Sequence, residues 1–169
     1  MLVIRPETTE DAAAVRQVNE EAFGRRDEAD IVEKLRSRQA FTLSLVATCA
    51  EKVVGHILFS PVTIESEFES FAVLGLGPVA VLPPYQNKGI GSQLIRTGIE
   101  ICRKAGHKVI VLVGHPTYYP RFGFLRASTY DLKYEYDVPD EAFMALELRQ
   151  SALEGRSGIV KFRPEFGEG

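Results

Sequence analysis

The sequence predicts a mixed α/β fold of the α+β type, in which helices flank a mostly antiparallel sheet. One supporting observation is a hairpin pattern over residues 43–59, where a short polar turn joins two strand-like segments. The other is a strand–loop–helix–strand unit over residues 79–113, whose two strands should lie side by side and parallel. The length of 169 residues fits a single domain spanning residues 1–169.

The N-terminal segment is predicted to form one strand and then two helices. Thr8 can cap the first helix, because Asp11, three positions on, can accept the reciprocal hydrogen bond from the Thr8 backbone. Apolar residues at helical spacing mark the buried face of each helix. The expected elements are a strand at 2–5, a helix with Ala12, Val15, Val18 and Ala22 on one face, and a helix at 29–36 that buries Ile31, Val32 and Leu35.

The middle of the chain is predicted to be rich in strands. The hairpin strands span 43–50 and 52–59, and 62–65 extends the second of them. An acidic turn over 65–70 then leads into a strand over 71–81. Glycines and Pro78 interrupt this strand, and proline cannot donate to a strand ladder, so we expect a bulge or bend there.

A long helix and a buried strand should follow. Gly106 is expected to end the helix, and the unbroken apolar run Val109–Val113 is typical of a strand buried on both faces. The residues that recur at helical spacing are Ile90, Leu94, Gly98, Ile101 and Ala105.

Three short strands are expected in the C-terminal part of the chain. They span 132–136, 142–148 and 158–162, and the last is predicted to be an edge strand. The second is ambiguous by period, because Pro139-Asp140-Glu141 could instead begin a helix.

The segment Gln86-Asn87-Lys88-Gly89-Ile90-Gly91 opens the long helix. Its two glycines let successive backbone N–H groups point into one concavity, which suits an anion such as a pyrophosphate. The P-loop pattern is absent, and the dinucleotide fingerprint fails because Leu94 replaces its third glycine. The alternative is a plain helix start with flexible turn residues.

Two motifs of this chain resemble motifs of the GNAT superfamily of acetyl-CoA-dependent N-acetyltransferases, and they follow one another in the same order. Gln86-x-x-Gly89-x-Gly91 matches its pyrophosphate-loop pattern, and Tyr119 before Gly123-Phe124 matches its Tyr-x-x-x-Gly-Phe element. The close match covers roughly residues 71–125, and the rest agrees in the order of elements. The resemblance implies a GNAT-like sheet whose parallel strand pair splays around acetyl-CoA.

The resemblance also implies roles for particular residues. The backbone of Val79 and Val81 would bind the pantetheine arm, with the Val81 N–H polarising the thioester carbonyl. Tyr119 would protonate the departing thiolate, since a phenol has a pKa of about 10; an aromatic ring packed under the sheet is its alternative, and Tyr118 is the second choice of acid. The expected coenzyme-binding residues are Val79, Ala80, Val81, Gln86, Asn87, Lys88, Gly89, Ile90, Gly91, Ser92 and Phe122.

The general base is left open by the sequence. Some GNAT enzymes place a glutamate on the bent strand, but the corresponding position, Gly77 or its neighbours, carries no carboxylate. His115 is one candidate because the pKa of histidine lies near neutrality, and it could equally be a loop residue that touches the coenzyme. His56 and His107 are interpreted as structural. The carboxylates that a water chain could recruit are Glu21, Glu28, Glu65, Glu67 and Glu69.

Composition and charge argue against several classes of binding partner. A net charge of −3 without a basic run argues against nucleic acid. No apolar stretch approaches the ~20 residues of a membrane span, and charged residues interrupt any signal-peptide pattern, so a cytoplasmic location is expected. Cys49 and Cys102 form no metal motif, no metal is expected, and Cys102 is interpreted as a small buried apolar residue.

The leading functional hypothesis is an enzyme that acetylates a primary amine of a small molecule or protein, as a monomer or homodimer. One alternative is a non-catalytic domain that binds or senses acyl-CoA. Another is a subunit that docks through a C-terminal edge strand. Acidic residues of the first two helices could attract a cationic amine or form an ordinary solvent-facing surface.

Overall fold

A computed structural model describes residues 1–168 of the chain. The chain forms two compact units. The first comprises Met1–Ser60, Leu76–Ile101 and the C-terminal segment from Pro164, and the second comprises Pro61–Gly75 and Cys102–Arg163. Each unit is described separately below.

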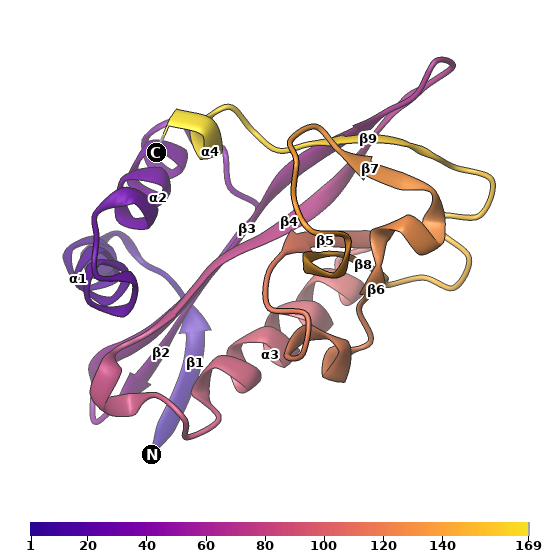
Figure 1. The fold of residues 1–169 in the computed structure, drawn as a ribbon. Helices are drawn as coiled ribbons and strands as arrows, with labels where there is room; N and C mark the ends of the chain where they lie inside the picture. The colour runs from indigo at the N-terminus through magenta and orange to yellow at the C-terminus, as the bar shows by residue number, and fades with distance from the viewer. Residues whose placement is uncertain (169) are drawn as a thin grey trace. The chain divides into compact units, whose positions relative to one another are not determined.

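The first unit combines strands with four helices (Figure 1). Its strands follow the order β1 (Leu2–Pro6), β2 (Leu43–Cys49), β3 (Lys52–Glu65) and β4 (Ser70–Val81), of which β3 and β4 continue into the second unit. Both β1–β2 and β2–β3 are antiparallel pairs, which confirms the predicted hairpin. The helices are α1 (Ala12–Phe23), α2 (Asp27–Ser37), α3 (Ile90–Lys104, whose last turn belongs to the second unit) and α4 (Glu165–Glu168).

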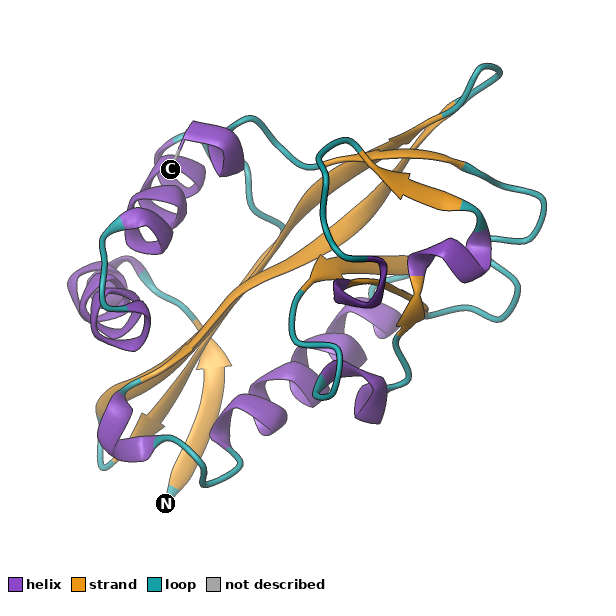
Figure 2. Ribbon diagram, in the orientation of Figure 1, coloured by secondary structure: helices purple, strands orange, loops and turns teal. Residues whose placement is uncertain are grey.

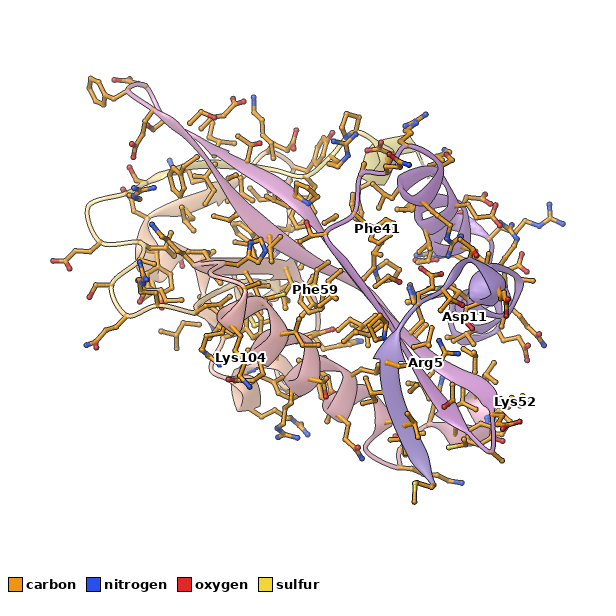
Figure 3. All side chains as sticks on the ribbon, turned by 180° about the vertical axis from the view of Figure 1, so that it is seen from behind. Arg5, Asp11, Phe41, Lys52, Phe59 and Lys104 are labelled. Atoms are coloured by element: carbon orange, nitrogen blue, oxygen red, sulfur yellow. The ribbon has the colours of Figure 1, made fainter. Side chains whose placement is uncertain are left out.

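Strand β3 presents opposite faces to the helices of this unit, because side chains alternate along a strand. On one face, Leu58 packs with apolar residues of α1 and α2. On the other, Phe59 (labelled in Figure 3) lies against α3 at Gly98. Helices α1 and α2 therefore cover one face of β3, and α3 covers the other.

The contact between Gly98 and Phe59 leaves no room for a methyl group. A Cβ built on Gly98 would lie 2.6 Å from Cζ of Phe59, closer than real Cβ atoms approach their neighbours. Glycine-to-alanine changes inside helices normally stabilise by roughly 1 kcal/mol. Here we expect Gly98→Ala to lower the free energy of unfolding by about 1–3 kcal/mol, because overpacking dominates.

Urea denaturation would measure this effect. In a double-mutant cycle, Phe59→Leu should recover part of the loss in the Gly98→Ala background, since it removes the opposing ring atoms. A stabilised Gly98→Ala protein would contradict the tight contact.

The start of α1 is fixed by the predicted exchange between Thr8 and Asp11. The Asp11 carboxylate accepts the Thr8 N–H at 2.7 Å, and one turn of 3₁₀-helix, Thr9–Asp11, precedes the α-helix. Arg5 from β1 donates two hydrogen bonds to the same carboxylate, at 2.7 and 3.0 Å (Figure 3). This bidentate pair joins strand β1 to the helix start and holds the pKa of Asp11 well below its usual range.

Replacing Asp11 with asparagine should therefore cost about 2 kcal/mol of stability at neutral pH, since hydrogen bonds to charged groups are involved. The pKa of Asp11 is lower in the folded than in the unfolded chain, so this stabilisation is present above pH ~4 and is lost as the pH falls further. The stability difference between wild type and Asp11→Asn should shrink accordingly on acidification in denaturant titrations. Glu10→Gln, at an exposed neighbouring position, is the matched control and should behave as wild type.

The second unit is built around β5 (Val109–Val113) and its neighbours. Strand β5 pairs in parallel with β4, at Leu74–Ile110 and Gly75–Val111, which confirms the predicted parallel pair. On its other side it pairs antiparallel with β8 (Phe143–Glu147), which in turn pairs with β6 (Leu125–Arg126). The core of the unit is formed by Val62, Ile64, Val73, Val109, Val111, Ala127, Leu132, Phe143, Ala145, Leu153 and Val160.

The remaining strands of this unit correct one prediction. Strand β9 (Gly158–Lys161) pairs antiparallel with β3 and in parallel with β7 (Leu132–Tyr134), so it is an inner strand. A strand does form in the predicted region, but the prediction that it is an edge strand is wrong. The apolar pattern of one segment does not show which other strands will pair with it. Docking of a partner through that edge loses its structural basis.

Two helix predictions also need correction. Helix α2 begins at Asp27, two residues earlier than expected, because its charged first turn still adopts helical geometry. In α3, Ile101 is 38% exposed and Ala105 is exposed beyond the helix end, whereas Ile99 and Cys102 are buried. The buried face of the helix therefore continues from Gly98 to Cys102, four residues on, and not to Ile101, three residues on.

Figure 2 shows short helical turns within the loops. They span Pro83–Tyr85, Tyr119–Phe122, Ala127–Tyr130 and Asp140–Ala142. The last resolves the ambiguity near residue 140, since one helical turn leads directly into strand β8. Over residues 1–168, no helix combines the length and apolar character that a membrane span requires.

Candidate functional site

The loop after β4 is anchored to the strands of the first unit. The Gln86 side-chain amide donates to the backbone carbonyl of Val81 at 2.9 Å, which ties the loop to the end of β4. The backbone N–H of Leu82 donates to the carbonyl of Val54 on β3, also at 2.9 Å. The first residue of the Gln86-x-x-Gly89-x-Gly91 pattern thus has a local structural role.

The loop then turns through left-handed backbone conformations into α3. Asn87 has φ +63° and Gly89 has φ +86°. The Gly89 carbonyl accepts the first helical hydrogen bond, from Gln93 at 3.0 Å, so the N–H groups of Ile90 and Gly91 have no acceptor within the helix. The positive end of the helix dipole lies at the same place.

The space beside Gly89 is open. A Cβ built on this residue meets no protein atom within 4 Å, although the backbone conformation itself disfavours side chains. The open face and the N–H groups without a helical acceptor fit a bound pyrophosphate, which can approach the backbone only where no side chain intervenes.

Two lysines converge on one aromatic ring beside this loop. The Lys88 ammonium lies 5.8 Å from the ring centroid of Tyr85, and the Lys52 ammonium of β3 lies 5.9 Å from it. Both lysines are exposed, and Tyr85 is half-buried. Sequence reasoning identified Lys88 but missed Lys52, because a residue 36 positions before Lys88 gives no local signal.

The predicted pantetheine-binding segment lies at the end of β4. Ala80 is buried, and Val79 and Val81 are half-buried. Gly77, just before them, has φ +141°, a conformation that side chains rarely adopt. This unusual backbone conformation lies where the glycine and proline pattern predicted a bulge or bend, and no carboxylate stands at this position.

In the second unit, Tyr119 begins a one-turn helix just after β5. Its ring packs edge-on against Phe124, with centroids 6.0 Å apart, and a Cβ on Gly114 would lie 2.5 Å from its Cε2. Burial, and to a lesser degree the neighbouring Tyr118, raise the pKa of Tyr119 to about 12. The phenol is therefore fully protonated at neutral pH and held in one orientation by its neighbours.

Tyr118 has different surroundings. The guanidinium carbon of Arg121 lies 4.6 Å from its ring centroid, and the Arg121 Nε donates to the Tyr118 carbonyl at 2.9 Å. Phe122 packs edge-on against Tyr118 with centroids 5.3 Å apart. His115, the candidate base, is exposed in the turn between β5 and this helix, and its carbonyl accepts the Tyr118 N–H.

Two of the carboxylates considered as bases form ion pairs with basic side chains. Arg25 forms a 2.5 Å ion pair with Glu28 and lowers the pKa of that carboxyl, which weakens it as a base. Glu65 pairs with Lys161 at 2.8 Å. The other candidates, Glu21, Glu67 and Glu69, are exposed.

The acidic surface of the first two helices is partly neutralised. Arg16 of α1 forms ion pairs with Glu20 at 3.2 Å, and with Asp30 and Glu33 of α2 at 2.9 Å each. Asp30 and Glu33 therefore link the two helices, which favours the interpretation as a structural surface over attraction of a cationic amine.

His56 is structural, as predicted. It is fully buried, with ring nitrogens 2.9 Å from the Ser44 hydroxyl and 3.2 Å from the Asn19 amide nitrogen. Burial, with a smaller contribution from Arg36, lowers its pKa to about 3. Cys102 is buried as expected, and within residues 1–168 no group of three His, Cys, Asp or Glu side chains could hold a metal ion.

Two cavities occur in the second unit, with volumes of about 480 and 500 Å³. They share Asp131 and Ser157 in their linings, and neither is lined by Tyr119 or His115. The motif residues therefore do not belong to these two cavities.

Comparison with known proteins identifies relatives that cover most of the chain. A family model described as an acetyltransferase (GNAT) domain matches residues 3–127. The uncharacterized N-acetyltransferase YjhQ of Escherichia coli (strain K12) is 43% identical over 135 residues, covering 78% of this chain and 74% of that protein. The uncharacterized N-acetyltransferase YhbS of the same strain is 33% identical over 166 residues, 98% of each chain.

Solved structures of GNAT acetyltransferases are also similar to this chain. The crystal structure of YhbS from E. coli, in complex with CoA, has a TM-score of 0.93 and covers 98% of this chain and 92% of that chain. A GNAT family acetyltransferase from Brucella melitensis, in complex with acetyl-CoA, is 38% identical, with a TM-score of 0.82 and 98% coverage of both chains. The residues matched by the family model include both the Gln86–Gly91 loop and Tyr119.

Proposed function

This chain belongs to the GNAT family of acetyltransferases, and we propose that it transfers the acetyl group of acetyl-CoA to a primary amine of a small molecule or protein. The observation that carries this proposal is the loop before α3. Its pattern matches the family's pyrophosphate loop, the space beside its Gly89 is open, and the first N–H groups of α3 have no acceptor within the helix. The relatives solved with CoA and acetyl-CoA support the choice of ligand.

We propose the following roles for the residues of this chain. The loop, with Ser92, holds the pyrophosphate, and the backbone of Val79 and Val81 binds the pantetheine arm as an added strand would. The Val81 N–H donates to the thioester oxygen, where negative charge develops. A main-chain donor suits this task because it is already oriented.

Tyr119 acts as the acid. The amine nitrogen attacks the thioester carbon, the new C–N bond forms, and the C–S bond breaks to release a thiolate. The Tyr119 hydroxyl gives its proton to that sulfur, and the proton lost by the amine restores the phenol through a base. The pKa of about 12 keeps Tyr119 protonated before the reaction, as an acid must be.

The base is proposed to be a carboxylate reached through a water chain, or His115, whose exposed position leaves it accessible. Glu28 is a poor candidate because its carboxyl is engaged by Arg25. We also propose that the chain acts as one acetyltransferase domain, since residues 3–127, matched by the family model, draw on both units.

A non-catalytic acyl-CoA sensor is the competing function. It would need the loop but not an oriented phenol, so the packed Tyr119 favours the enzyme. Calorimetric titration with acetyl-CoA, followed by a free-thiol release assay over amines, amino acids and peptides, decides between the two. Binding with thiol release on one acceptor supports the transferase, binding without turnover supports the sensor, and no binding contradicts both.

A further inference from the structure

We propose that Lys52 and Lys88, held against the Tyr85 ring, bind the ribose 3′-phosphate of coenzyme A and give the protein a preference for CoA over 3′-dephospho-CoA. This inference rests on the proposed function, because it assumes that the Gln86–Gly91 loop binds the pyrophosphate of the same molecule. It adds a residue from β3, Lys52, that belongs to neither sequence motif.

The three residues come from separate segments of the first unit. Lys52 is the first residue of β3, Tyr85 ends the helical turn after β4, and Lys88 lies within the loop. The distances of 5.9 and 5.8 Å to one ring centroid place the two ammonium groups no farther apart than the sum of these values. Each is within the range in which an aromatic face attracts a cation.

The fold fixes Lys52 in this position. Ala50 and Glu51 form the turn with φ +49° and +68°, and Cys49 pairs with Lys52 to close the β2–β3 hairpin. The Leu82–Val54 hydrogen bond ties the start of β3 to the segment that leads into Tyr85. Lys52 (labelled in Figure 3) is therefore presented beside the loop by backbone contacts, although it is remote in sequence.

The charges of these lysines are not neutralised by the protein. Many other cations of the chain, such as Arg5, Arg16 and Lys161, form ion pairs with carboxylates. Within the part of the chain that the structure describes, neither Lys52 nor Lys88 has an ion-pair partner. Both ammonium groups are therefore available to a bound anion.

Coenzyme A supplies a matching anion. Its ribose carries a 3′-phosphate one sugar away from the pyrophosphate, so a molecule held by the loop brings a second, dianionic group close by. Lysine suits such a group because its ammonium is a compact charge on a flexible chain, able to follow an exposed phosphate.

The test compares two ligands by calorimetry, acetyl-CoA and acetyl-3′-dephospho-CoA. We expect the wild type to prefer acetyl-CoA, and Lys52→Met to reduce that preference about fivefold, as for an exposed ion pair. The affinity of Lys52→Met for the dephospho ligand should be unchanged. Lys104→Met, at another exposed lysine (Figure 3), is the matched control and should retain the full preference.

The role of the ring has its own readout. Tyr85→Leu should reduce the preference, whereas Tyr85→Phe should retain it, since the aromatic face and not the hydroxyl holds the ammonium groups. The preference should also shrink with added salt.

The outcomes separate the two proposals. If the wild type binds neither ligand, the proposed function fails. If it binds both equally, or if Lys52→Met weakens both ligands by the same factor, only the 3′-phosphate inference is overturned.

Discussion

Tyr119→Phe is expected to lower the rate of acetyl transfer by about 10²–10⁴-fold, the usual contribution of a general acid, while acetyl-CoA affinity stays the same. The substitution removes only the hydroxyl. The ring can keep its edge-on contact with Phe124 and its fit against Gly114, so the fold around it should persist. Steady-state kinetics with any accepted amine, together with calorimetry on acetyl-CoA, measure the two quantities separately.

Tyr118→Phe is the matched control, since it makes the same chemical change at the adjacent residue. Tyr118 packs against Arg121 and Phe122, and its loss of a hydroxyl should leave turnover near the wild-type value. A damaging Tyr118→Phe beside a harmless Tyr119→Phe would move the acid by one position. If neither change lowers turnover, the leaving thiolate needs no tyrosine.

The raised pKa of Tyr119 adds a further constraint. Because burial raises it to about 12, the phenol stays protonated throughout the range from pH 7 to 10. Its deprotonation should not contribute a fall in activity within that range, and any fall there must come from another group.

The second large effect is expected at Gly89. Gly89→Leu should weaken acetyl-CoA binding by at least ~100-fold, because a side chain would occupy the open space that we propose for the phosphates. Calorimetric titration of the folded variant measures this loss. The protein should stay folded despite a backbone cost of about 1–2 kcal/mol for the left-handed conformation, since an added Cβ meets no atom within 4 Å.

A matched control exists at the other end of the same helix. Gly106 has φ +91°, close to the +86° of Gly89, and an added Cβ there also meets nothing within 4 Å. Gly106→Leu should therefore carry a similar backbone cost of about 1–2 kcal/mol while acetyl-CoA binding is retained. Equal affinities of the two variants for acetyl-CoA would remove the loop from the binding site.

Local sequence signals predicted the elements that depend on neighbours in the chain. The hairpin of β2 and β3 followed from a short turn between apolar segments, and β5 followed from five consecutive apolar residues. The cap between Thr8 and Asp11 also depends on residues three apart. Each of these is decided within one segment, so its pattern is sufficient.

Features that depend on distant segments were not predictable in this way. The apolar run at 158–162 indicates a strand, but its place between β3 and β7 depends on two other segments. The burial of Cys102 in place of Ile101 depends on where the helix rests. For the same reason the sequence could propose site residues only where the motifs are contiguous, and the meeting of Lys52 with Tyr85 required the fold.

The buried His56 allows local opening of the first unit to be followed by spectroscopy. A solvated imidazole gains its proton near pH 6.5, whereas the ring enclosed by Asn19 and Ser44 keeps its neutral form until about pH 3. In a nuclear magnetic resonance titration, its ring signal should stay flat across the physiological range. Any protonation step recorded there would come from molecules in which α1 has separated from β2 and β3, so one resonance would report how often the helix opens.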